Sequence, residues 1–195
     1  MKSPLKRIIA SYDDKGVYVY QAFTPSIVQS ALEHGTFDKG FSLDRMTWIK
    51  PSFGWMLYRS GYASKHGQEA ILKIKLLHSG FLDILRQSVE TSFQPFFESE
   101  TAWSSALAKS DVRHQWDPDR AVSGQRLDRR AIQIGIRGKT VQRYVHDWII
   151  GLEDVTDLAR DIQKAIKLRN TLPEVPHEDE YKVDHELSPR LGIPL

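Results

Sequence analysis

Segments with strand-like and helix-like patterns follow one another along this sequence without a regular strand–helix–strand repeat. Residues 69–77 and 130–137 alternate between apolar and polar side chains, which is typical of β-strands. Residues 155–166 instead place apolar side chains at helical spacing. Because the two kinds of segment are mixed without strict alternation, the sequence predicts an α+β fold. A length of 195 residues suits a single compact domain with a sizeable core.

Proline and glycine mark the ends of several predicted elements. Pro25 and Pro51 suit the first turn of a helix, and Gly35 and Gly61 suit the position after its end. Gly16 suits the turn of an N-terminal hairpin between strands 5–12 and 17–23. The other predicted strands are 69–77, 130–137 and 148–152, and residues 41–49 hold a strand or loop. The predicted helices are 25–34, 51–60, 81–89, 103–108, 141–145 and 155–166, and residues 111–127 are predicted to form a long loop.

The net charge of +2 conceals two segments of opposite charge. Residues 113–143 contain eight basic and three acidic residues, whereas residues 171–195 contain six acidic and two basic residues. The basic segment predicts a partner that carries phosphate, such as a nucleotide or RNA. We therefore divide the chain into a domain at 1–170 and an acidic tail at 171–195. The tail is expected to pack on the domain or to remain partly extended.

Several classes of protein are excluded by what the sequence lacks. It has no cysteine, so it offers neither a disulfide framework nor a thiolate nucleophile. The seven histidines show no metal-ligand spacing, and the sequence predicts no metal site. No phosphate-binding P-loop, dinucleotide fingerprint, nucleophile elbow or HExxH motif is present. With neither a signal peptide nor an apolar run of about 20 residues, the chain is expected to be soluble and cytoplasmic.

A polar and aromatic cluster surrounds the start of the helix predicted at 51–60. Free backbone N–H groups near Ser52 and Phe53 are suited to bind a phosphate, because a helix N-terminus favours negative charge. Arg45, Lys50 and Arg59 would neutralise that charge, and Trp48 would stack on a base or a nicotinamide ring. The alternative is an ordinary buried helix with flanking basic residues.

A second cluster lies in the basic segment. Its candidate substrate-binding residues are Arg113, His114, Trp116, Arg129 and Arg130. Exposed tryptophan is uncommon without a partner, so Trp116 in a loop is typical of ligand recognition. Arg129 and Arg130 point to opposite faces of a strand, and only one of them can reach a shared cleft. The alternative here is a surface loop held by salt bridges.

Several runs in the sequence resemble the family known as domain of unknown function 4291. They cover nearly the whole chain, and the most specific is the run RMTWIKPSF at 45–53. The others are YDD at 12–14, VYQAF at 19–23, FS at 41–42, YRSG at 58–61, QWDP at 115–118 and IQIG at 132–135. The resemblance names the family and implies no activity.

The order of elements in the first half is also similar to that of small ADP-ribosyltransferase-like domains. This similarity implies two small, mainly antiparallel sheets with flanking helices, and NAD bound in the cleft between them. It implies that Gln21 or Tyr20 orients the cofactor and that Thr47, Ser52 or Tyr58 holds its nicotinamide end. Gln133 then takes the place that an acidic residue or glutamine has on a later strand. Since glutamine cannot act as a general base, a mechanism that needs a carboxylate there lacks its usual residue.

Three functions are compatible with these features. The first is a nucleotide-dependent transferase that acts on a nucleic acid or another phosphate-bearing substrate. Its candidate catalytic residues are Gln21, Thr47, Lys50, Tyr58 and Gln133, and its candidate cofactor-binding residues are Tyr20, Arg45, Trp48, Ser52 and Arg59. The second is a ligase or nucleotidyltransferase acting on RNA ends, with Lys50 as covalent nucleophile. The third is a non-catalytic RNA-binding module in which Trp116 or Tyr144 stacks on bases.

Overall fold

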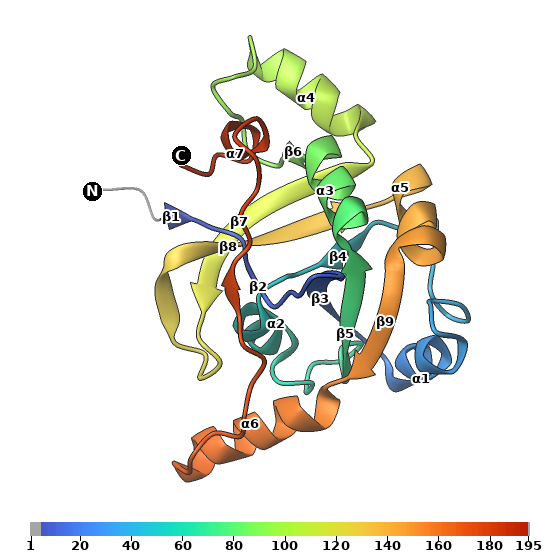
Figure 1. Cartoon of the computed structure of the whole chain (residues 1–195), viewed down its shortest axis with the longest axis vertical. Helices are drawn as coiled ribbons and strands as arrows, with labels where there is room; N and C mark the ends of the chain where they lie inside the picture. Colours follow the sequence, from blue (N-terminus) through green and yellow to red (C-terminus); the bar gives the residue numbers. More distant parts are fainter. Residues whose placement is uncertain (1–4, 195) are drawn as a thin grey trace.

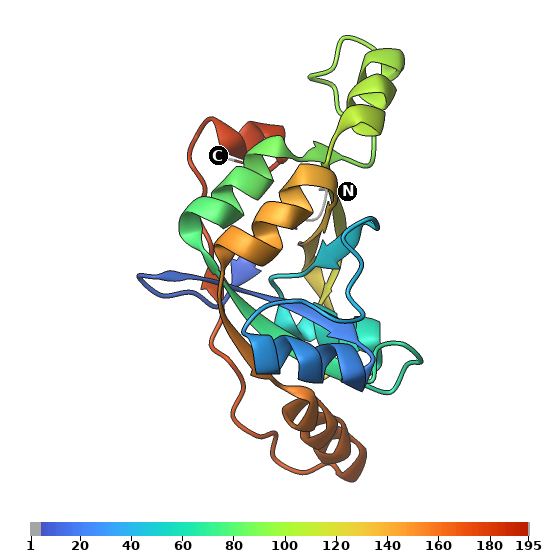
Figure 2. The same cartoon turned by 90° about the vertical axis from the view of Figure 1, so that its right-hand side faces the viewer.

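The computed structural model describes residues 5–194 and has an α+β architecture with three small sheets (Figure 1). Most helices lie around the sheets, whereas α4 stands away from the rest of the molecule (Figure 2). The helices are α1 (Pro25–His34), α2 (Phe53–Ser60), α3 (His78–Gln87), α4 (Glu100–Lys109), α5 (Gly138–Arg143), α6 (Thr156–Leu168) and α7 (Leu187–Arg190), and a π-helical turn, η1 (Tyr144–Trp148), extends α5. The α+β prediction is therefore confirmed. No helix within residues 5–194 has both the length and the apolar character that crossing a membrane requires.

The largest sheet has five strands and is built around a long antiparallel hairpin. Its strands are β1 (Leu5–Lys6), β4 (Thr47–Ile49), β6 (Val89–Glu90), β7 (Val112–Arg120) and β8 (Arg126–Ile136). Strands β7 and β8 form the hairpin, β6 extends it beyond β7, and β1 and β4 both pair with β8. The prediction of a long loop at 111–127 is wrong, because most of this segment forms β7. Its one proline, Pro118, and the flanking Asp117 and Asp119 are accommodated near a register shift between Pro118 and Arg120.

The second sheet has three antiparallel strands and meets the first at one point. Its strands are β3 (Gly16–Phe23), β5 (Ala70–Leu77) and β9 (Ile149–Asp154), in the order β3-β5-β9. Just after β4, Lys50 and Tyr20 exchange two backbone hydrogen bonds of 2.7 and 3.1 Å. This bridge joins the two sheets through Tyr20, which precedes Gln21, and Lys50, which follows Ile49 of β4.

The N-terminal hairpin is only partly as predicted. The turn at Asp13–Gly16 forms, and Tyr12 bridges to Val17. Residues 5–12 do not continue along β3, however. Instead β1 joins the large sheet, and β2 (Ile9–Ala10) pairs with β10 (Asp179–Glu180) from the C-terminal segment. A local sequence pattern cannot predict these pairings, because they join residues more than a hundred positions apart.

The predicted helix boundaries agree closely with the structure where proline and glycine mark them. Helix α1 begins with Pro25, and Gly35 follows it with a φ of +69°. Helix α2 ends before Gly61, which has a φ of +61°. Its start differs from the prediction, since Ser52 caps the helix and Pro51 precedes the cap. The Ser52 hydroxyl accepts a hydrogen bond from the Trp55 amide at 3.3 Å.

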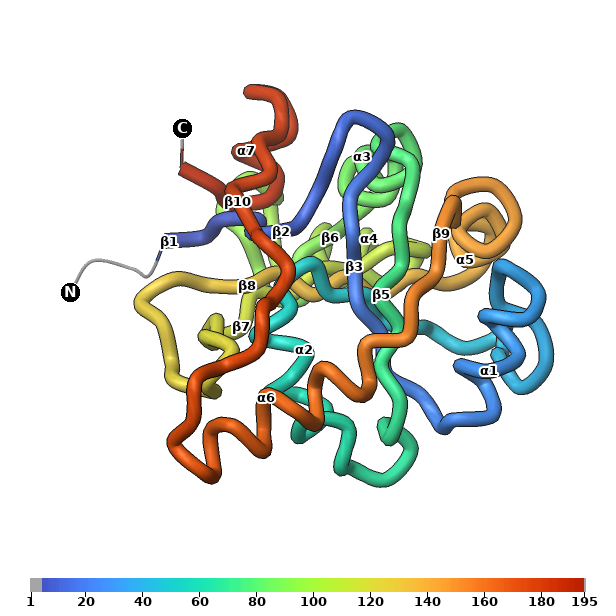
Figure 3. The backbone as a smooth tube through the Cα atoms, turned by 60° about the horizontal axis from the view of Figure 1, so that its bottom comes forward, coloured from blue at the N-terminus to red at the C-terminus, as the bar shows by residue number. Residues whose placement is uncertain are grey.

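The segment after α6 runs back along the molecule past α2 and β2 to α7 (Figure 3). Two of its leucines, Leu187 and Leu191, are buried in the main hydrophobic core. The Trp116 indole also donates a hydrogen bond of 3.0 Å to the Leu191 carbonyl. This segment thus packs against the five-stranded sheet.

Candidate functional site

The hairpin β7–β8 has one apolar face and one polar face. On β7, the side chains of Val112, His114 and Trp116 are buried, whereas the intervening Arg113, Gln115 and Asp117 are half-buried. On β8, Gln133 pairs in register with Gln115 and Gly135 pairs with Arg113. We call the side of the hairpin on which Arg113, Gln115 and Asp117 lie the polar face. It comprises Trp48, Lys50, Arg113, Gln115, Asp117 and Gln133.

Asp117 is held on the polar face by two amides. Gln133 donates from Nε2 to Asp117 Oδ2 at 2.6 Å, and Gln115 donates to Oδ1 at 2.9 Å. Each carboxylate oxygen can accept a further hydrogen bond, because an ionised carboxylate has about four acceptor positions. The pair of amides therefore fixes the orientation of a carboxylate that is still open to a ligand.

Trp48 reaches the polar face because Gly135 has no side chain. Trp48 pairs in register with Gly135. A Cβ atom added to Gly135 would lie 3.0 Å from the Trp48 ring and 2.7 Å from the sulfur of Met46. The glycine is thus required for the tryptophan to lie flat against the sheet, close to Gln133.

Lys50 is buried, with only 6% of its surface exposed. Its ammonium donates to the carbonyl of Trp48 at 3.4 Å. Burial and the positive charge of Arg59 lower the pKa of Lys50 to about 8, while the charge of Asp117 acts in the opposite direction. Near neutral pH, a larger share of this amine is unprotonated than in an exposed lysine, which favours nucleophilic or proton-transfer chemistry.

Gln21 and Thr47 lie next to Lys50 but belong to a buried network. Gln21 donates from Nε2 to Thr47 Oγ1 at 2.6 Å and to the Trp48 carbonyl at 3.3 Å. Its Oε1 accepts a hydrogen bond of 2.7 Å from the Tyr144 hydroxyl. The Trp48 carbonyl is thus shared by Gln21 and Lys50. Thr47 also lines a pocket of about 320 Å³ that has Phe23, Phe41 and Arg45 in its walls.

A second charged cluster lies beside the start of α2. Asp119 is fully buried, accepts a hydrogen bond of 2.9 Å from Ser52 and pairs with Arg129 at 2.6 Å. The Phe53 amide, in the first turn of α2, donates to the carboxyl of Glu178 at 2.6 Å. The predicted phosphate position at this helix start is therefore occupied by a side chain of the chain itself.

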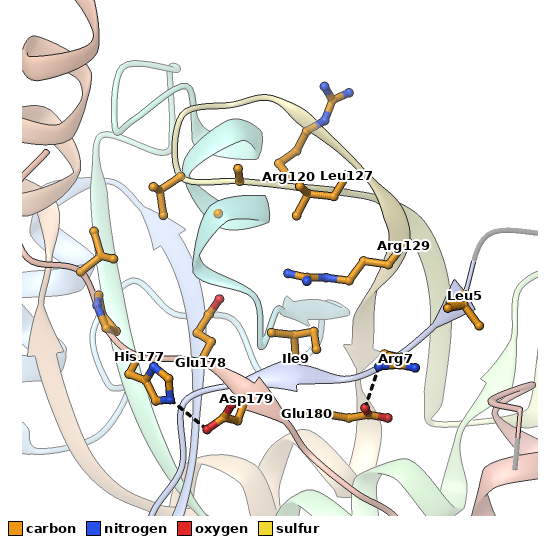
Figure 4. Close-up of a pocket in the computed structure, with 15 residues that line it drawn as sticks. Leu5, Arg7, Ile9, Arg120, Leu127, Arg129, His177, Glu178, Asp179 and Glu180 are labelled. Carbon is orange, nitrogen blue, oxygen red and sulfur yellow. Dashed lines mark hydrogen bonds and ion pairs between the residues drawn. The ribbon is translucent and has the colours of Figure 1, made fainter. Parts of the chain in front are cut away.

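Glu178 belongs to a segment that forms one wall of a pocket of about 770 Å³ (Figure 4). We call this segment, Val175–Glu180, the strap. The opposite wall comes from the β7–β8 hairpin, with Arg120, Leu127 and Arg129. Burial raises the pKa of Glu178 to about 8, and the charge of Asp119 adds to this effect, against the opposing Phe53 amide and Arg129. Glu178 therefore occupies the helix start as a largely neutral carboxyl group at pH 7.

Comparison with known families adds an assignment. A family model described as "Domain of unknown function (DUF4291)" matches residues 7–181. The chain belongs to this family. The matched DUF4291 range includes the whole polar face and the strap. No curated protein matches the sequence.

The structure brings together only some of the residues that the sequence singled out. Lys50, Trp48 and Gln133 lie on the polar face, and the positive charge of Arg59 reaches Lys50. Arg45 lines a different pocket, and Ser52 and Arg129 belong to the cluster at the start of α2. The prediction that Arg129 and Arg130 separate is confirmed, since Arg130 donates instead to the Trp116 carbonyl.

Five residues with aromatic or imidazole side chains do not lie where the predictions needed them. Trp116 is 8% exposed and packs in the core, so the expected exposed loop tryptophan is wrong. His114 is fully buried on the same face, where it contacts Ser88 at 2.8 Å and lies 3.6 Å from Glu90. Tyr20 and Tyr144 are also fully buried, so neither ring can stack on a base at the surface. Tyr58 lies away from Ser52, in the last turn of α2, where Arg120 covers its ring.

Sequence reasoning missed the carboxylates. Asp117, Asp119 and Glu178 were not among the predicted site residues, although each lies in one of the two clusters. The polar positions 113, 115 and 117 alternate with the apolar or aromatic ones, which is the pattern of a half-buried strand. That pattern was hidden by the proline and aspartates that made the segment resemble a loop.

Proposed function

We propose that this protein is a nucleotide-dependent transferase that holds a phosphate-bearing substrate on the polar face. One observation gives the proposal its strongest support. Lys50, Asp117 and Gln133 come from three separate segments and lie together on one face of the sheet. Solubility alone does not require such a cluster, and oriented carboxylate, amide and amine groups are typical of active sites.

The roles follow from the chemistry of each group. Lys50 and Arg59 supply positive charge for a pyrophosphate, and Trp48 supplies an aromatic surface for a ring. Asp117 accepts hydrogen bonds from ribose hydroxyls, and the two glutamines keep it oriented. If the nucleotide is NAD, the bond between ribose and nicotinamide breaks, and nicotinamide leaves with the electron pair. The acceptor oxygen then attacks the ribose carbon and transfers its proton to Asp117.

Asp117 can supply the carboxylate that the later strand lacks. The resemblance to ADP-ribosyltransferase-like domains assigns that place to Gln133, which cannot serve as a base. Gln133 is hydrogen-bonded to Asp117 on the neighbouring strand. In this proposal the carboxylate lies on the strand next to the one that the resemblance implies, and Gln133 holds it in position.

A second candidate reaction is favoured by the burial of Lys50 and by its pKa of about 8. In nucleotidyl transfer, the neutral amine attacks the α-phosphorus of ATP. A nitrogen–phosphorus bond forms, the bond to the bridging oxygen breaks, and pyrophosphate leaves with the electron pair. The adenylyl group then passes from Lys50 to a phosphate end.

Binding of NAD and ATP, measured by isothermal titration calorimetry, tests the proposal. We expect at least one of them to bind, and Asp117→Asn to weaken that binding by about tenfold or more, since a lost charge-assisted contact costs about 1.5–3 kcal/mol. Asp161→Asn, an exposed change on α6, serves as the control and leaves the affinity unchanged. If neither nucleotide binds, or if Asp117→Asn binds as the unaltered protein does, the proposal fails.

The products separate the candidate reactions. Release of nicotinamide from NAD supports ribosyl transfer. A mass increase of the Lys50 peptide by one adenylyl group after incubation with ATP supports nucleotidyl transfer. Binding without either product overturns both reactions and leaves a non-catalytic binding module.

A further inference from the structure

Helix α2 lies beside the tip of the β7–β8 hairpin (Figure 4), and its exposed residues, Tyr58 and Arg59, form one edge of the molecule with that tip. The Tyr62 hydroxyl, just after α2, donates to the Val122 carbonyl in the hairpin turn at 3.0 Å. A Cβ atom added to Gly54 would lie 2.1 Å from the carbonyl oxygen of Arg120, so the helix and the hairpin are in direct backbone contact. Residues on this edge are therefore held in a fixed relation to one another.

Two arginines face each other across the hairpin at this edge. Arg120 and Arg126 are register partners of the antiparallel pair. Like charges directly opposite each other on neighbouring strands destabilise a sheet. Within residues 5–194, neither side chain forms an ion pair with a carboxylate, and the same is true of Arg59 on α2. Asp128 is the nearby exposed acid on β8, and it leaves the edge with a clear excess of positive charge.

Aromatic rings lie next to these cations. The Tyr58 ring stacks on Trp55 with a centroid distance of 5.6 Å and an interplanar angle of 23°. The guanidinium carbon of Arg120 lies 4.0 Å from the centre of the Tyr58 ring. Tyr58 remains 42% exposed. We call the Trp55 ring, the Tyr58 ring and the Arg120 guanidinium together the ladder. One more planar ring can stack on it, because guanidinium planes and aromatic rings both stack on bases.

We propose that this edge, comprising Tyr58, Arg59, Arg120 and Arg126, binds a single-stranded polynucleotide. The arginines contact successive phosphates, and a base stacks at the Arg120 end of the ladder. Positive charge interleaved with stacked aromatic groups is the arrangement that binds single strands with little sequence preference. The occupant is a polynucleotide rather than a small anion because the charges are spread over two elements instead of converging on one point.

The edge adjoins the polar face and so has a place in the proposed reaction. Arg59 belongs to the edge, and its charge reaches Lys50. A strand bound along the edge therefore brings its end toward Lys50 and Asp117, as the acceptor of the transferred group. This role rests on the proposed function, whereas the binding itself does not.

Fluorescence polarisation with labelled 12-nucleotide RNA and DNA single strands, at a series of salt concentrations, tests the proposal. We expect binding at low salt that weakens as salt increases, with a log–log slope of about −0.7 for each phosphate contacted. Arg120→Ala with Arg126→Ala should reduce that slope by about 1.4 and weaken binding by about tenfold or more. The charge-matched control combines Lys109→Ala and Lys139→Ala, two exposed positions on α4 and α5, and should leave the slope unchanged.

Arg120→Lys separates stacking from charge. Lysine keeps the positive charge but has no planar group to stack, so the slope should stay constant while the affinity falls several-fold. Circular dichroism confirms that each variant is folded. Stronger binding of RNA than of DNA identifies contacts to the 2′-hydroxyl, and equal binding identifies a general single-strand site. Tighter binding of a duplex than of either single strand overturns the proposal, as does an absence of binding at low salt or an unchanged affinity in the Arg120 and Arg126 double variant.

The two proposals can fail independently. The arginine double variant should bind NAD or ATP as the unaltered protein does, because neither residue touches the polar face cluster. Asp117→Asn should bind the nucleotide about tenfold or more weakly and keep its affinity for the oligonucleotide. Loss of nucleotide binding in the arginine double variant would contradict the separation of the two sites.

Discussion

The two faces of the β7–β8 hairpin differ in chemistry although their residues alternate one by one along the same strands. On the core face, Trp116 and His114 are 8% and 0% exposed and pack with Ile132 and Ile134. On the polar face, Gln115, Asp117 and Gln133 form a hydrogen-bonded cluster. Two side chains predicted to bind substrate, Trp116 and His114, are therefore buried in the core. Along these two strands, the face on which a residue lies therefore indicates its role better than its amino-acid type does.

The core face also contains polar groups, but these groups form hydrogen bonds and ion pairs with one another. His114 contacts Ser88, and Glu90 pairs with Lys6 at 2.9 Å. Burial lowers the pKa of His114, although the neighbouring Glu90 opposes this effect. This network joins β1, β6 and β7 behind the sheet. The polar groups of the core face thus bond to one another, whereas Asp117 on the polar face accepts hydrogen bonds from Gln115 and Gln133 and has further acceptor positions.

Replacement of Trp116 should have the largest effect on stability. Trp116→Ala removes a buried aromatic ring and its hydrogen bond to Leu191, and we expect the free energy of unfolding to fall by about 3–5 kcal/mol. Gln115→Ala, the neighbouring position on the polar face, should cost less than about 1 kcal/mol. Urea denaturation measures both values. Equal losses would show that the two faces do not differ in the way described.

Glu178 should make stability depend on pH through its burial beside the start of α2. Its pKa in the folded protein is about 8, above its ordinary value of 4.5. The folded state therefore binds more protons than the unfolded state between these values, and stability falls as the pH rises from about 5 to 8, by at most about 1.4 kcal/mol per pH unit. Glu178→Gln should remove this contribution, and Glu174→Gln, an exposed change just before the strap, should retain it. An identical pH dependence in all three proteins would show that Glu178 is not buried against α2.

Lys50 should show the opposite dependence at higher pH. Its pKa in the folded protein is about 8, below its ordinary value of 10.5. The unfolded state then binds more protons between these values, so the stability of the unaltered protein rises from about pH 8 to 10.5. Lys50→Met should be more stable than the unaltered protein at pH 7, and this advantage should shrink across that interval. Thermal unfolding with Lys139→Met as the exposed control measures the difference, and a destabilised Lys50→Met protein would contradict it.

The smallest expected effect concerns the orientation of Asp117. Gln133→Ala removes one of the two amides on this carboxylate and should change the unfolding free energy by less than about 1 kcal/mol, because the position is half-buried. Nucleotide affinity should fall several-fold, less than in Asp117→Asn. Calorimetry of both variants compares them. A larger loss in Gln133→Ala than in Asp117→Asn would assign the glutamine a direct contact with the ligand.

Local signals in the sequence were sufficient for most elements but not for their pairing. Pro25 with Gly35, and Gly61, placed helix ends correctly because these residues constrain the backbone directly. The strand at Ile9–Ala10 and its partner at Asp179–Glu180 have only two residues each, which is too short for a periodic pattern. Strand β7 was missed because Pro118 and four charged residues resemble a loop in composition.

The candidate site was predictable only in part for the same reason. Lys50, Trp48 and Gln133 were found from their chemistry and from the family runs. The contact between Glu178 and the Phe53 amide joins residues 125 positions apart, and no local pattern encodes it. The acidic tail was expected either to pack or to extend, and only the structure shows which of its carboxyl groups meets the start of α2.

The position of Leu187 and Leu191 in the main core has a consequence for how the protein is made. A ribosome synthesises these residues after every strand of the five-stranded sheet, and Trp116 cannot complete its burial or its hydrogen bond until they have left the exit tunnel. Domains generally fold as units during synthesis. Here the packing of Trp116 is completed only once residues 187–191 have emerged, so the part of the apolar face that these two leucines cover stays exposed after the whole five-stranded sheet has been synthesised.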